Sequence, residues 1–484
     1  MKSPVIRPLL PLAWLYGLVV RLRGAAYDRG WLRSRAFGLP VICVGNLAVG
    51  GTGKTPHTEY LIRLLRAAGL RVATLSRGYR RHTRGFLLAT TASTAAQVGD
   101  EPAQMKGKYP DVTVAVCEDR CEGIRRLMEV DKAPNADKAS DVGKASDVDK
   151  ASDADKVHNV DEAHNVGKAH DTGKTPDPDE THNVGMASDV GKAHNADKAS
   201  DVGETPDVIV LDDAYQHRRV RPGLSILLTD YHRPFCIDAL LPAGRLREPW
   251  RHGKERADLV VVTKCPPDLT ADDRIALARR LALRGDQRLY FSTLLYSALR
   301  PVFPQAADPR TDRPMLQADE AVLVVTGIAQ PAPLLEEVRR HTVHIATLAF
   351  ADHHDFSDRD LRSIGEAFDR LLPRQAASTT STSTTSTSPN FSAESASSPP
   401  GRHGPHPEAR PARSRLILTT EKDAVRLRHH PHFPDRLKPH LYALPVEVSF
   451  LFDEQPSFNQ NIIAYVSTHT RDRRLPPRAD AHDT

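Results

Sequence analysis

The most restrictive feature of this chain is a glycine-rich loop between a short apolar run and an amphipathic segment. Residues 40–45 (PVICVG) have the β-branched, apolar character of a buried strand. Beyond the loop, apolar residues recur at helical spacing from Tyr60 to Ala68, and Gly69 is a typical helix-stop residue. The order of strand, glycine-rich loop and helix predicts a nucleotide phosphate-binding loop within an α/β fold.

The loop itself, residues 46–56 (NLAVGGTGKTP), contains the residue types that triphosphate binding needs. Its glycines let backbone N–H groups approach phosphate oxygens, and the N-terminus of the following helix favours an anion. We expect Lys54 to reach the β- and γ-phosphates of ATP and the Thr55 hydroxyl to bind Mg²⁺. Ala48 stands where the usual pattern has its first glycine. The predicted nucleotide-binding residues are Ala48, Val49, Gly50, Gly51, Thr52, Gly53, Lys54 and Thr55.

The same four letters, GKTP, recur at residues 173–176. No apolar strand precedes this second copy and no helical pattern follows it, so the setting that the motif requires is missing. We expect it to bind no nucleotide. Lys174 is therefore an internal control for Lys54.

A second apolar run, residues 208–211 (VIVL), ends in Asp212 and Asp213. Carboxylates at the carboxyl end of a parallel strand are typical of the Mg²⁺ site beside a phosphate-binding loop. Many strands end in aspartate, so this pattern alone is weak evidence for a metal site. It becomes stronger evidence together with the phosphate-binding loop earlier in the chain. The predicted metal ligands are Thr55, Asp212 and Asp213.

Two low-complexity stretches interrupt the 484-residue chain. Residues 131–206 repeat a six-residue, mostly polar unit, whereas a stacked β-helix needs a bulky aliphatic residue in each turn. Burial of such small side chains does not offset the ~1–2 kcal/mol per residue of backbone ordering, so we expect a disordered insertion. Its histidines leave a metal-binding alternative open, although a solvated tract is favoured. Residues 375–413, rich in Ser, Thr and Pro, predict a flexible linker.

The N-terminal residues 1–38 combine an apolar run, 8–20, with flanking arginines. This pattern favours a helix in a membrane interface, with Trp14 and Tyr16 at the acyl boundary and the arginines at anionic head groups. A secretory signal fits poorly, because no small-x-small cleavage site ends the run. Packing of the helix on the protein's own core is the alternative. No run reaches the ~20 apolar residues of a spanning helix.

Charge and cysteine content exclude other classes of protein. The 66 basic and 61 acidic residues nearly balance, which argues against a nucleic-acid partner. Five cysteines are too few for a disulfide scaffold and indicate a reducing compartment. Cys117 and Cys121 have no second pair at metal-ligand spacing, so a zinc site is not expected.

Further polar strings follow other apolar runs, and each of them alone is typical of a solvated loop. In their joint order they resemble the tetraacyldisaccharide 4'-kinase family, over residues 1–130, 207–374 and 414–467. Besides the loop, the strings that carry the resemblance are 76–79 (SRGY), 99–102 (GDEP), 212–218 (DDAYQHR), 246–248 (LRE), 262–264 (VTK), 326–329 (TGIA), 352–353 (DH) and 420–423 (TEKD).

The resemblance implies an enzyme that uses ATP and Mg²⁺ to phosphorylate the 4'-hydroxyl of an acylated glucosamine disaccharide 1-phosphate, the lipid A precursor. It also implies a peripheral protein at the cytoplasmic face of the bacterial inner membrane. Its expected catalytic residues are Asp100 as the base, His353 as the partner of that base, and Lys54. The residues expected to hold the sugar and its 1-phosphate are Arg77, Tyr79, Arg120, Gln216, His217, Arg247 and Glu248.

We therefore expect an α/β fold, with a three-layer domain of the P-loop NTPase type around a mostly parallel sheet. The expected division is an N-terminal membrane-interface helix in 1–38, the kinase domain in 39–130 and 207–315, the insertion 131–206, a smaller α/β domain in 316–374 and 414–467, the linker 375–413 and a disordered tail 468–484. Two other functions stay open: an ATPase switch and a membrane-associated scaffold, both without lipid kinase activity. The sequence indicates no oligomeric state.

Overall fold

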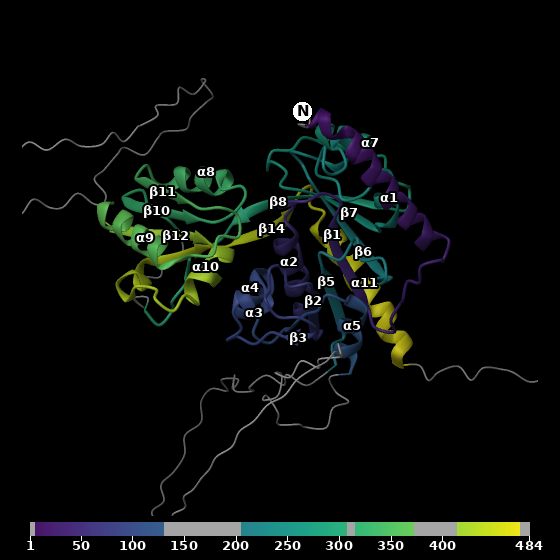
Figure 1. Ribbon diagram of the computed structural model, residues 1–484, viewed down its shortest axis with the longest axis horizontal. Coiled ribbons are helices and arrows are strands. Elements are labelled where there is room, and N and C mark those ends of the chain that lie inside the picture. Colours follow the sequence, from purple (N-terminus) through teal and green to yellow (C-terminus); the bar gives the residue numbers. More distant parts are fainter. Residues whose placement is uncertain (1–4, 130–204, 307–314, 372–413, 475–484) are drawn as a thin grey trace, which may run out of the picture. The chain divides into compact units, whose positions relative to one another are not determined.

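The computed structural model describes residues 5–129, 205–306, 315–371 and 414–474 (Figure 1). Almost the whole hexapeptide tract, the Ser/Thr/Pro linker and the end of the expected tail lie outside the described residues. The expectations for those three segments therefore remain predictions. All of the described residues belong to one unit.

The larger of two sheets has nine strands in the order β14-β8-β7-β6-β1-β5-β2-β4-β3. Its seven central strands are parallel, and only the edge strands β14 and β3 are antiparallel to their neighbours. Nearly unbroken apolar runs form the centre, because parallel strands are buried on both faces. The strands are β1 (Val41–Asn46), β2 (Val72–Ser76), β3 (Leu87–Leu88), β4 (Thr113–Val116), β5 (Val208–Asp212), β6 (Leu224–Asp230), β7 (Leu259–Thr263), β8 (Arg288–Tyr296) and β14 (Val446–Phe450).

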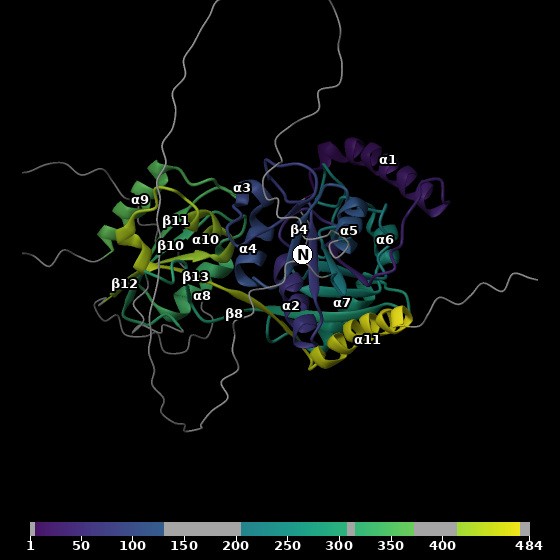
Figure 2. The same ribbon diagram turned by 90° about the horizontal axis from the view of Figure 1, so that it is seen from below.

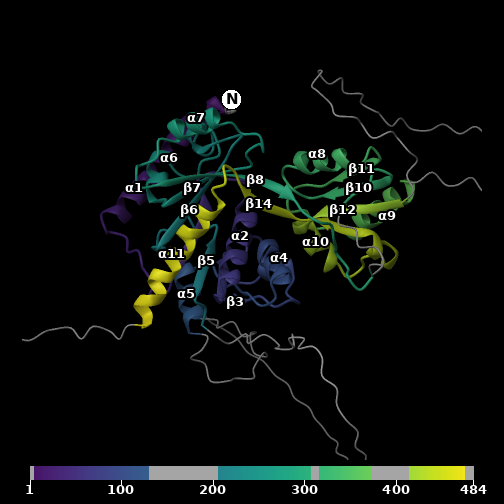
Figure 3. The same cartoon turned by 180° about the vertical axis from the view of Figure 1, so that it is seen from behind.

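Helices cover both faces of this sheet, which gives three layers. Alternate residues of β1 belong to different cores: Ile42 packs with α2, α4 and α11, whereas Cys43 packs with α5 and α7. Figure 2 shows α1 (Leu10–Asp28) and α11 on opposite sides of the strands, and Figure 3 shows α11 crossing in front of them. The helices are α2 (Lys54–Ala67), α3 (Ala95–Val98), α4 (Asp100–Lys108), α5 (Arg120–Met128), α6 (Trp250–Gly253), α7 (Ala271–Leu281) and α11 (Gln455–Arg474).

The second sheet has five strands in the order β11-β10-β12-β13-β9. Its strands are parallel except for the short β9, and helices again cover both faces: α9 and α10 on one, α8 on the other. The elements are β9 (Arg300–Pro301), β10 (Glu320–Thr326), α8 (Ala332–His341), β11 (Ile345–Ala349), α9 (Asp358–Arg370), β12 (Ser414–Thr420), α10 (Glu421–Arg428) and β13 (Leu441–Leu444).

The end of the chain differs from the expected division. Strand β14 pairs with β8, and α11 packs on the nine-stranded sheet, so residues 446–474 do not continue the smaller sheet. The helix also extends to Arg474, beyond the expected boundary at 467. Phe458, Ile462 and Val466 form one apolar helical stripe, and the Phe458 ring stacks on Phe450 with centroids 4.3 Å apart. This buried stripe explains why the segment returns to the first sheet.

The N-terminal segment forms a short 3-10 turn, Arg7–Leu9, and helix α1 (Leu10–Asp28). The helix docks through small residues, because Ala13, Gly17 and Gly24 are buried and a Cβ on Gly17 would lie 2.6 Å from Leu240 Cδ1. Its large apolar side chains are exposed, Trp14 at 69% and Leu22 at 63%. By length and composition alone, Arg7–Asp28 is long and apolar enough to cross a membrane, which differs from the sequence expectation.

Candidate active site

The predicted phosphate-binding loop connects β1 to the N-terminus of α2. Gly50 and Gly53 have φ values of +105° and +79°, a left-handed range that favours glycine. The buried Thr52 fixes the loop: its hydroxyl accepts a 2.8 Å hydrogen bond from Asn46 Nδ2, and its carbonyl accepts one of 2.9 Å from Thr263 Oγ1. The loop is thus held from β1 and from β7, which lie on either side of β6.

A cation that the sequence did not indicate lies against this loop. Arg245 Nε donates to the Val49 carbonyl at 2.9 Å. A Cβ at Gly50 would lie 1.8 Å from Arg245 Nη2, so a side chain there would displace the guanidinium group. Lys264 Nζ donates to the Gly51 carbonyl from the end of β7. The loop therefore faces more positive charge than Lys54 alone supplies.

The two predicted metal carboxylates follow β5 and have different surroundings. Asp213 Oδ1 lies 3.6 Å from Lys54 Nζ and 3.1 Å from Arg247 Nη1. Burial opposes ionisation of Asp213, but these two cations outweigh it and lower its pKa. Asp212 accepts a 3.3 Å hydrogen bond from Thr58, and burial, together with the neighbouring Asp213 charge, raises its pKa to about 7.

This donor set fits Mg²⁺. Within the described part of the chain, no three His, Cys, Asp or Glu side chains form a metal cluster. Mg²⁺ does not require one, because it usually takes one or two carboxylates and completes its shell with substrate phosphates and water. The adjacent Asp212 and Asp213 also place two carboxylates where a divalent cation would offset their repulsion.

The predicted base and its partner are brought together from positions 253 residues apart. His353 Nδ1 lies 2.7 Å from Asp100 Oδ2, and His353 Nε2 lies 2.8 Å from Lys422 Nζ. A lysine ammonium can only donate, so Nε2 accepts and the ring proton resides on Nδ1, where it donates to Asp100.

Arg426 completes this cluster and was not predicted. Its Nε donates to Asp100 Oδ1 at 2.8 Å, and its Nη2 contacts Asp100 Oδ2. Burial would raise the pKa of Asp100, but the hydrogen bonds from His353 and Arg426 lower it well below its usual range. Asp100 is thus a carboxylate at neutral pH. Both Lys422 and Arg426 lie on α10, one helical turn apart, which is the local signal that could have indicated them.

Glycines bring the loop after β2 close to this pair. Gly78 and Gly99 have positive φ, and a Cβ on Gly99 would lie 3.1 Å from Gly78 backbone atoms. Tyr79, in the same loop, has its ring centroid 5.3 Å from that of His353. Glu101, next to Asp100, adds to the effects of burial and of Asp213 that raise the pKa of Asp212, so the predicted base lies beside a residue that interacts electrostatically with the predicted metal ligand.

The other predicted substrate residues are only partly brought together. Gln216 joins two of them, because its amide oxygen accepts from Arg247 at 3.1 Å and its Nε2 donates to Glu248 at 3.1 Å. Glu248 is already paired with Arg256 at 2.8 Å, a partner that the sequence did not indicate. The remaining three make other contacts: Arg77 is exposed, Arg120 is buried and donates to the Cys117 carbonyl at 2.8 Å, and His217 Nε2 lies 4.0 Å from Asp119. Arg120 nevertheless lies close enough to interact electrostatically with Asp212, Asp213 and Arg77.

A buried charge cluster also joins α2, α4 and α10. Lys108 Nζ lies 2.6 Å from Glu59 Oε2 and 2.7 Å from Glu421 Oε1. The Lys108 and Glu59 side chains are 7% and 1% exposed. Burial and the charge of Glu421 raise the pKa of Glu59, and Lys108 opposes that rise. One cation thus offsets two carboxylates, and it ties the helix that begins at Asp100 to the helix that begins at Lys54.

Lys108→Met is expected to lower the free energy of unfolding by about 3–5 kcal/mol, because it leaves the buried Glu59 without its cation. The loss should grow with pH. A carboxyl group whose pKa is raised in the folded state is protonated and uncharged in acid. The folded protein then becomes less stable as the pH rises above the ordinary carboxyl range, because the buried group must ionise. Urea denaturation of wild type and variant at acidic and at neutral pH measures this.

Lys106→Met is the matched control on the same helix. Lys106 is also buried, but its Nζ donates to the carbonyls of Pro110 and Val112, at 2.8 and 2.9 Å. Its loss is expected to cost less, about 1–3 kcal/mol, since no buried carboxylate is left bare. A Lys108→Met loss that is no larger than this, or that does not change between acidic and neutral pH, would contradict the assignment.

Comparison with known proteins agrees with this geometry. The family model described as tetraacyldisaccharide-1-P 4'-kinase matches residues 5–136 and 178–376. A tetraacyldisaccharide 4'-kinase of Bacteroides thetaiotaomicron is 42% identical, with 98% of this chain and 97% of the relative covered. One from Flavobacterium johnsoniae is 34% identical, with 95% and 96% covered.

A solved structure shows the same fold. The crystal structure of the apo form of LpxK from Aquifex aeolicus in complex with ATP is similar with a TM-score of 0.55 at 22% identity, covering 95% of this chain and 98% of that one. Together with the family match, this identifies the relationship: the chain belongs to the tetraacyldisaccharide-1-P 4'-kinase family.

Proposed function

We propose that this chain transfers the γ-phosphoryl group of ATP to the 4'-hydroxyl of tetraacyldisaccharide 1-phosphate, and so acts in lipid A biosynthesis. Its family membership supports this reaction. The observation that carries it is the combination of a glycine-rich loop between a strand and a helix with an Asp100–His353 pair held at 2.7 Å. The loop alone would suit an ATPase switch, whereas an oriented carboxylate suits transfer to a hydroxyl acceptor.

The residues of the loop would neutralise the triphosphate. Backbone N–H groups at the start of α2 and the Lys54 ammonium would bind the β- and γ-phosphates. Lys54 would exchange its 3.6 Å contact with Asp213 for the phosphate. Thr55 and one or both of Asp212 and Asp213 would hold Mg²⁺, which supplies further positive charge at the phosphate oxygens.

Asp100 would accept the proton of the 4'-hydroxyl as the new O–P bond forms and the γ-phosphoryl leaves ADP. His353 is a positioning residue in this scheme: its Nδ1–H fixes one carboxylate oxygen, and Lys422 fixes the ring from the other side. Arg426 keeps the carboxylate ionised and oriented. General-base assistance of this kind requires such fixed geometry.

Helix α1 supports a location at a membrane surface. Its exposed side carries Leu12, Trp14, Leu15, Val19 and Leu22, while its small residues face the protein. An apolar face with flanking arginines suits the interface of the inner membrane, on the cytoplasmic side where ATP is available. The acyl chains of the substrate would then not need to leave the bilayer during transfer.

A transfer assay tests the proposal. The wild-type protein is incubated with ATP labelled at the γ-phosphate, Mg²⁺ and the tetraacyldisaccharide 1-phosphate in neutral detergent. The label is expected in the lipid fraction, as a bisphosphorylated disaccharide. Release of labelled inorganic phosphate without labelled lipid would instead indicate an ATPase and would refute the proposal.

A further inference from the structure

The side chain of Arg245 lies against the phosphate-binding loop, and the proposed reaction gives it no role. Its Nε donates to the Val49 carbonyl at 2.9 Å. Its Nη2 lies 1.8 Å from the position that a Cβ on Gly50 would occupy. The guanidinium group therefore fills the space beside the loop that a side chain at Gly50 would take.

The main chain around Arg245 is held independently of this side chain. The Arg245 carbonyl accepts from the Val49 N–H at 2.8 Å, and the Arg247 N–H donates to the Leu47 carbonyl at 2.7 Å, in the pattern of an antiparallel pair. The Arg245 N–H donates to Asp238 Oδ1 at 3.2 Å. A shorter side chain at position 245 would therefore leave these backbone contacts with the loop in place.

Arg245 lies on the side of its segment that faces the predicted metal site. Leu246, the next residue, is buried with 1% exposure, and Arg247 follows it. Alternate side chains of an extended segment point to the same side, so the two arginines share one side. Arg247 Nη1 lies 3.1 Å from Asp213 Oδ1, which lies 3.6 Å from Lys54 Nζ. The position of Arg245 is thus suited to a triphosphate bound at Lys54.

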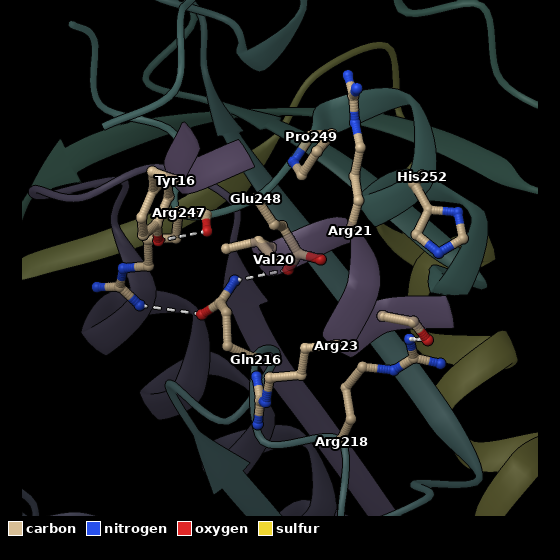
Figure 4. A pocket seen from close by; sticks show the side chains of 11 residues that line it. Tyr16, Val20, Arg21, Arg23, Gln216, Arg218, Arg247, Glu248, Pro249 and His252 are labelled. Carbon is tan, nitrogen blue, oxygen red and sulfur yellow. Dashed lines mark hydrogen bonds between the residues drawn. The ribbon is translucent and has the colours of Figure 1, made fainter. Parts of the chain in front are cut away.

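Arg247 itself already has an ion-pair partner. Its Nη1 is shared between Asp213 and the Gln216 amide oxygen, which it contacts at 3.1 Å. Gln216 in turn donates to Glu248, and Figure 4 shows these last three side chains joined in this way. The charge of Arg247 is therefore offset by a carboxylate, and its side chain is held in place.

Lys264 approaches the loop from the end of β7 and is also paired. Its Nζ donates to the Gly51 carbonyl, to Asp230 at 2.8 Å and to the Gln330 amide oxygen at 3.4 Å, so three acceptors match its three N–H groups. Arg245 differs from both cations. In the ranges that the structure describes, it has no ion-pair partner, and Nη1 and Nη2 have no acceptor. Its charge and these two groups are available to a bound anion.

We propose that Arg245 is a catalytic residue that donates from Nη1 and Nη2 to oxygens of the γ-phosphoryl group during transfer; this inference rests on the proposed function. The planar guanidinium group can bind two phosphate oxygens at once, and its Nε contact with Val49 already fixes its plane.

The role of Arg245 is electrostatic. The bond between the γ-phosphorus and the β–γ bridging oxygen breaks, the bond to the 4'-oxygen forms, and the hydroxyl proton passes to Asp100. Arg245 keeps its protons throughout. Negative charge is spread over the oxygens of the transferring group, and a cation that contacts them from the enzyme's own chain stabilises the transition state.

The test measures kcat at saturating ATP and lipid, and the Kd for ATP, in Arg245→Gln and in Arg245→Lys. A contact made mainly in the transition state lowers kcat and leaves substrate binding unchanged. For Arg245→Gln we expect kcat to fall by about 10²–10³-fold, with the Kd for ATP within about threefold of wild type. Arg245→Lys should lose about 10-fold or more in kcat, because one ammonium cannot replace the planar fork.

Arg251→Gln is the matched control. Arg251 is exposed on α6, and its guanidinium carbon lies 5.1 Å from the centroid of the Trp250 ring. The substitution removes the same charge a few residues along the chain, away from the loop, and should keep the wild-type kcat.

The possible outcomes are distinct. If Arg245→Lys keeps the wild-type kcat, the residue only anchors the Val49 carbonyl and the inference is overturned. If Arg245→Gln loses affinity for ATP, with or without a loss in kcat, the side chain supports the loop or the bound nucleotide, and the inference is again wrong. If wild type transfers no label to the lipid, the proposed function fails and the inference fails with it. The inference alone fails when wild type labels the lipid and Arg245→Gln does so with a similar kcat.

Discussion

Lys54→Ala is expected to lower phosphoryl transfer to the lipid by about 10²–10³-fold, whereas Lys174→Ala should transfer at the wild-type rate. Both lysines stand in the same four letters, GKTP. Lys54 follows a buried strand, begins α2 and lies 3.6 Å from the predicted metal ligand Asp213, whereas Lys174 lies outside the described residues and has no strand or helix pattern beside it in the sequence. The comparison thus separates the chemistry of the motif from its structural setting.

The measurement is the initial rate of label incorporation into lipid, with the free energy of unfolding determined in parallel for both variants. Lys54 is half-buried at the start of α2, so an unchanged denaturation curve shows that the loss is catalytic. Equal rates for the two variants would mean that the loop of residues 48–55 does not hold the triphosphate.

Asp100→Ala and His353→Ala are each expected to lower kcat by roughly 10²–10⁴-fold, with the Kd for ATP largely kept. The first removes the proton acceptor, and the second removes the group that orients it. The two effects should not add in the double variant, because both side chains act through one 2.7 Å contact. Single-turnover rates and ATP binding by calorimetry separate kcat from nucleotide affinity.

His354→Ala provides the matched control. His354 is the next residue, but its Nε2 lies 3.0 Å from Asp360 and its ring stacks on Phe350, away from Asp100. It should keep near wild-type turnover. The assignment is wrong if His353→Ala stays within a few-fold of wild type, or if His354→Ala loses as much activity.

The sequence predicted those parts of the site whose residues are close together in the chain. Strand, glycine-rich loop and helix are consecutive, so the apolar run of 40–45 and the spacing after Tyr60 were sufficient to predict the loop and its place in the sheet. The aspartates after β5 were predicted for the same reason. Their different pKa directions were not, because these depend on Lys54 and Arg247, which are remote in the sequence.

For contacts between residues that are far apart in the sequence, the neighbouring residues gave no indication. The pairing of Asp100 with His353 came from the family resemblance, and nothing in the residues around either position specifies it. Arg426 and Arg245 were missed because each is one arginine among many, and its role appears only when the chain folds back on Asp100 or on Gly50. The placement of β14 and α11 on the first sheet was missed because chain order suggested that they continue the second.

The most direct test of the account is a crystal structure of this protein with Mg²⁺ and a non-hydrolysable ATP analogue. The account predicts a triphosphate wrapped by the loop of residues 48–55, with Lys54 at the β- and γ-phosphates, Asp212 or Asp213 at the metal, and the γ-phosphate facing Asp100. A triphosphate bound elsewhere, or one whose γ-phosphate is separated from Asp100 by the protein, would contradict it.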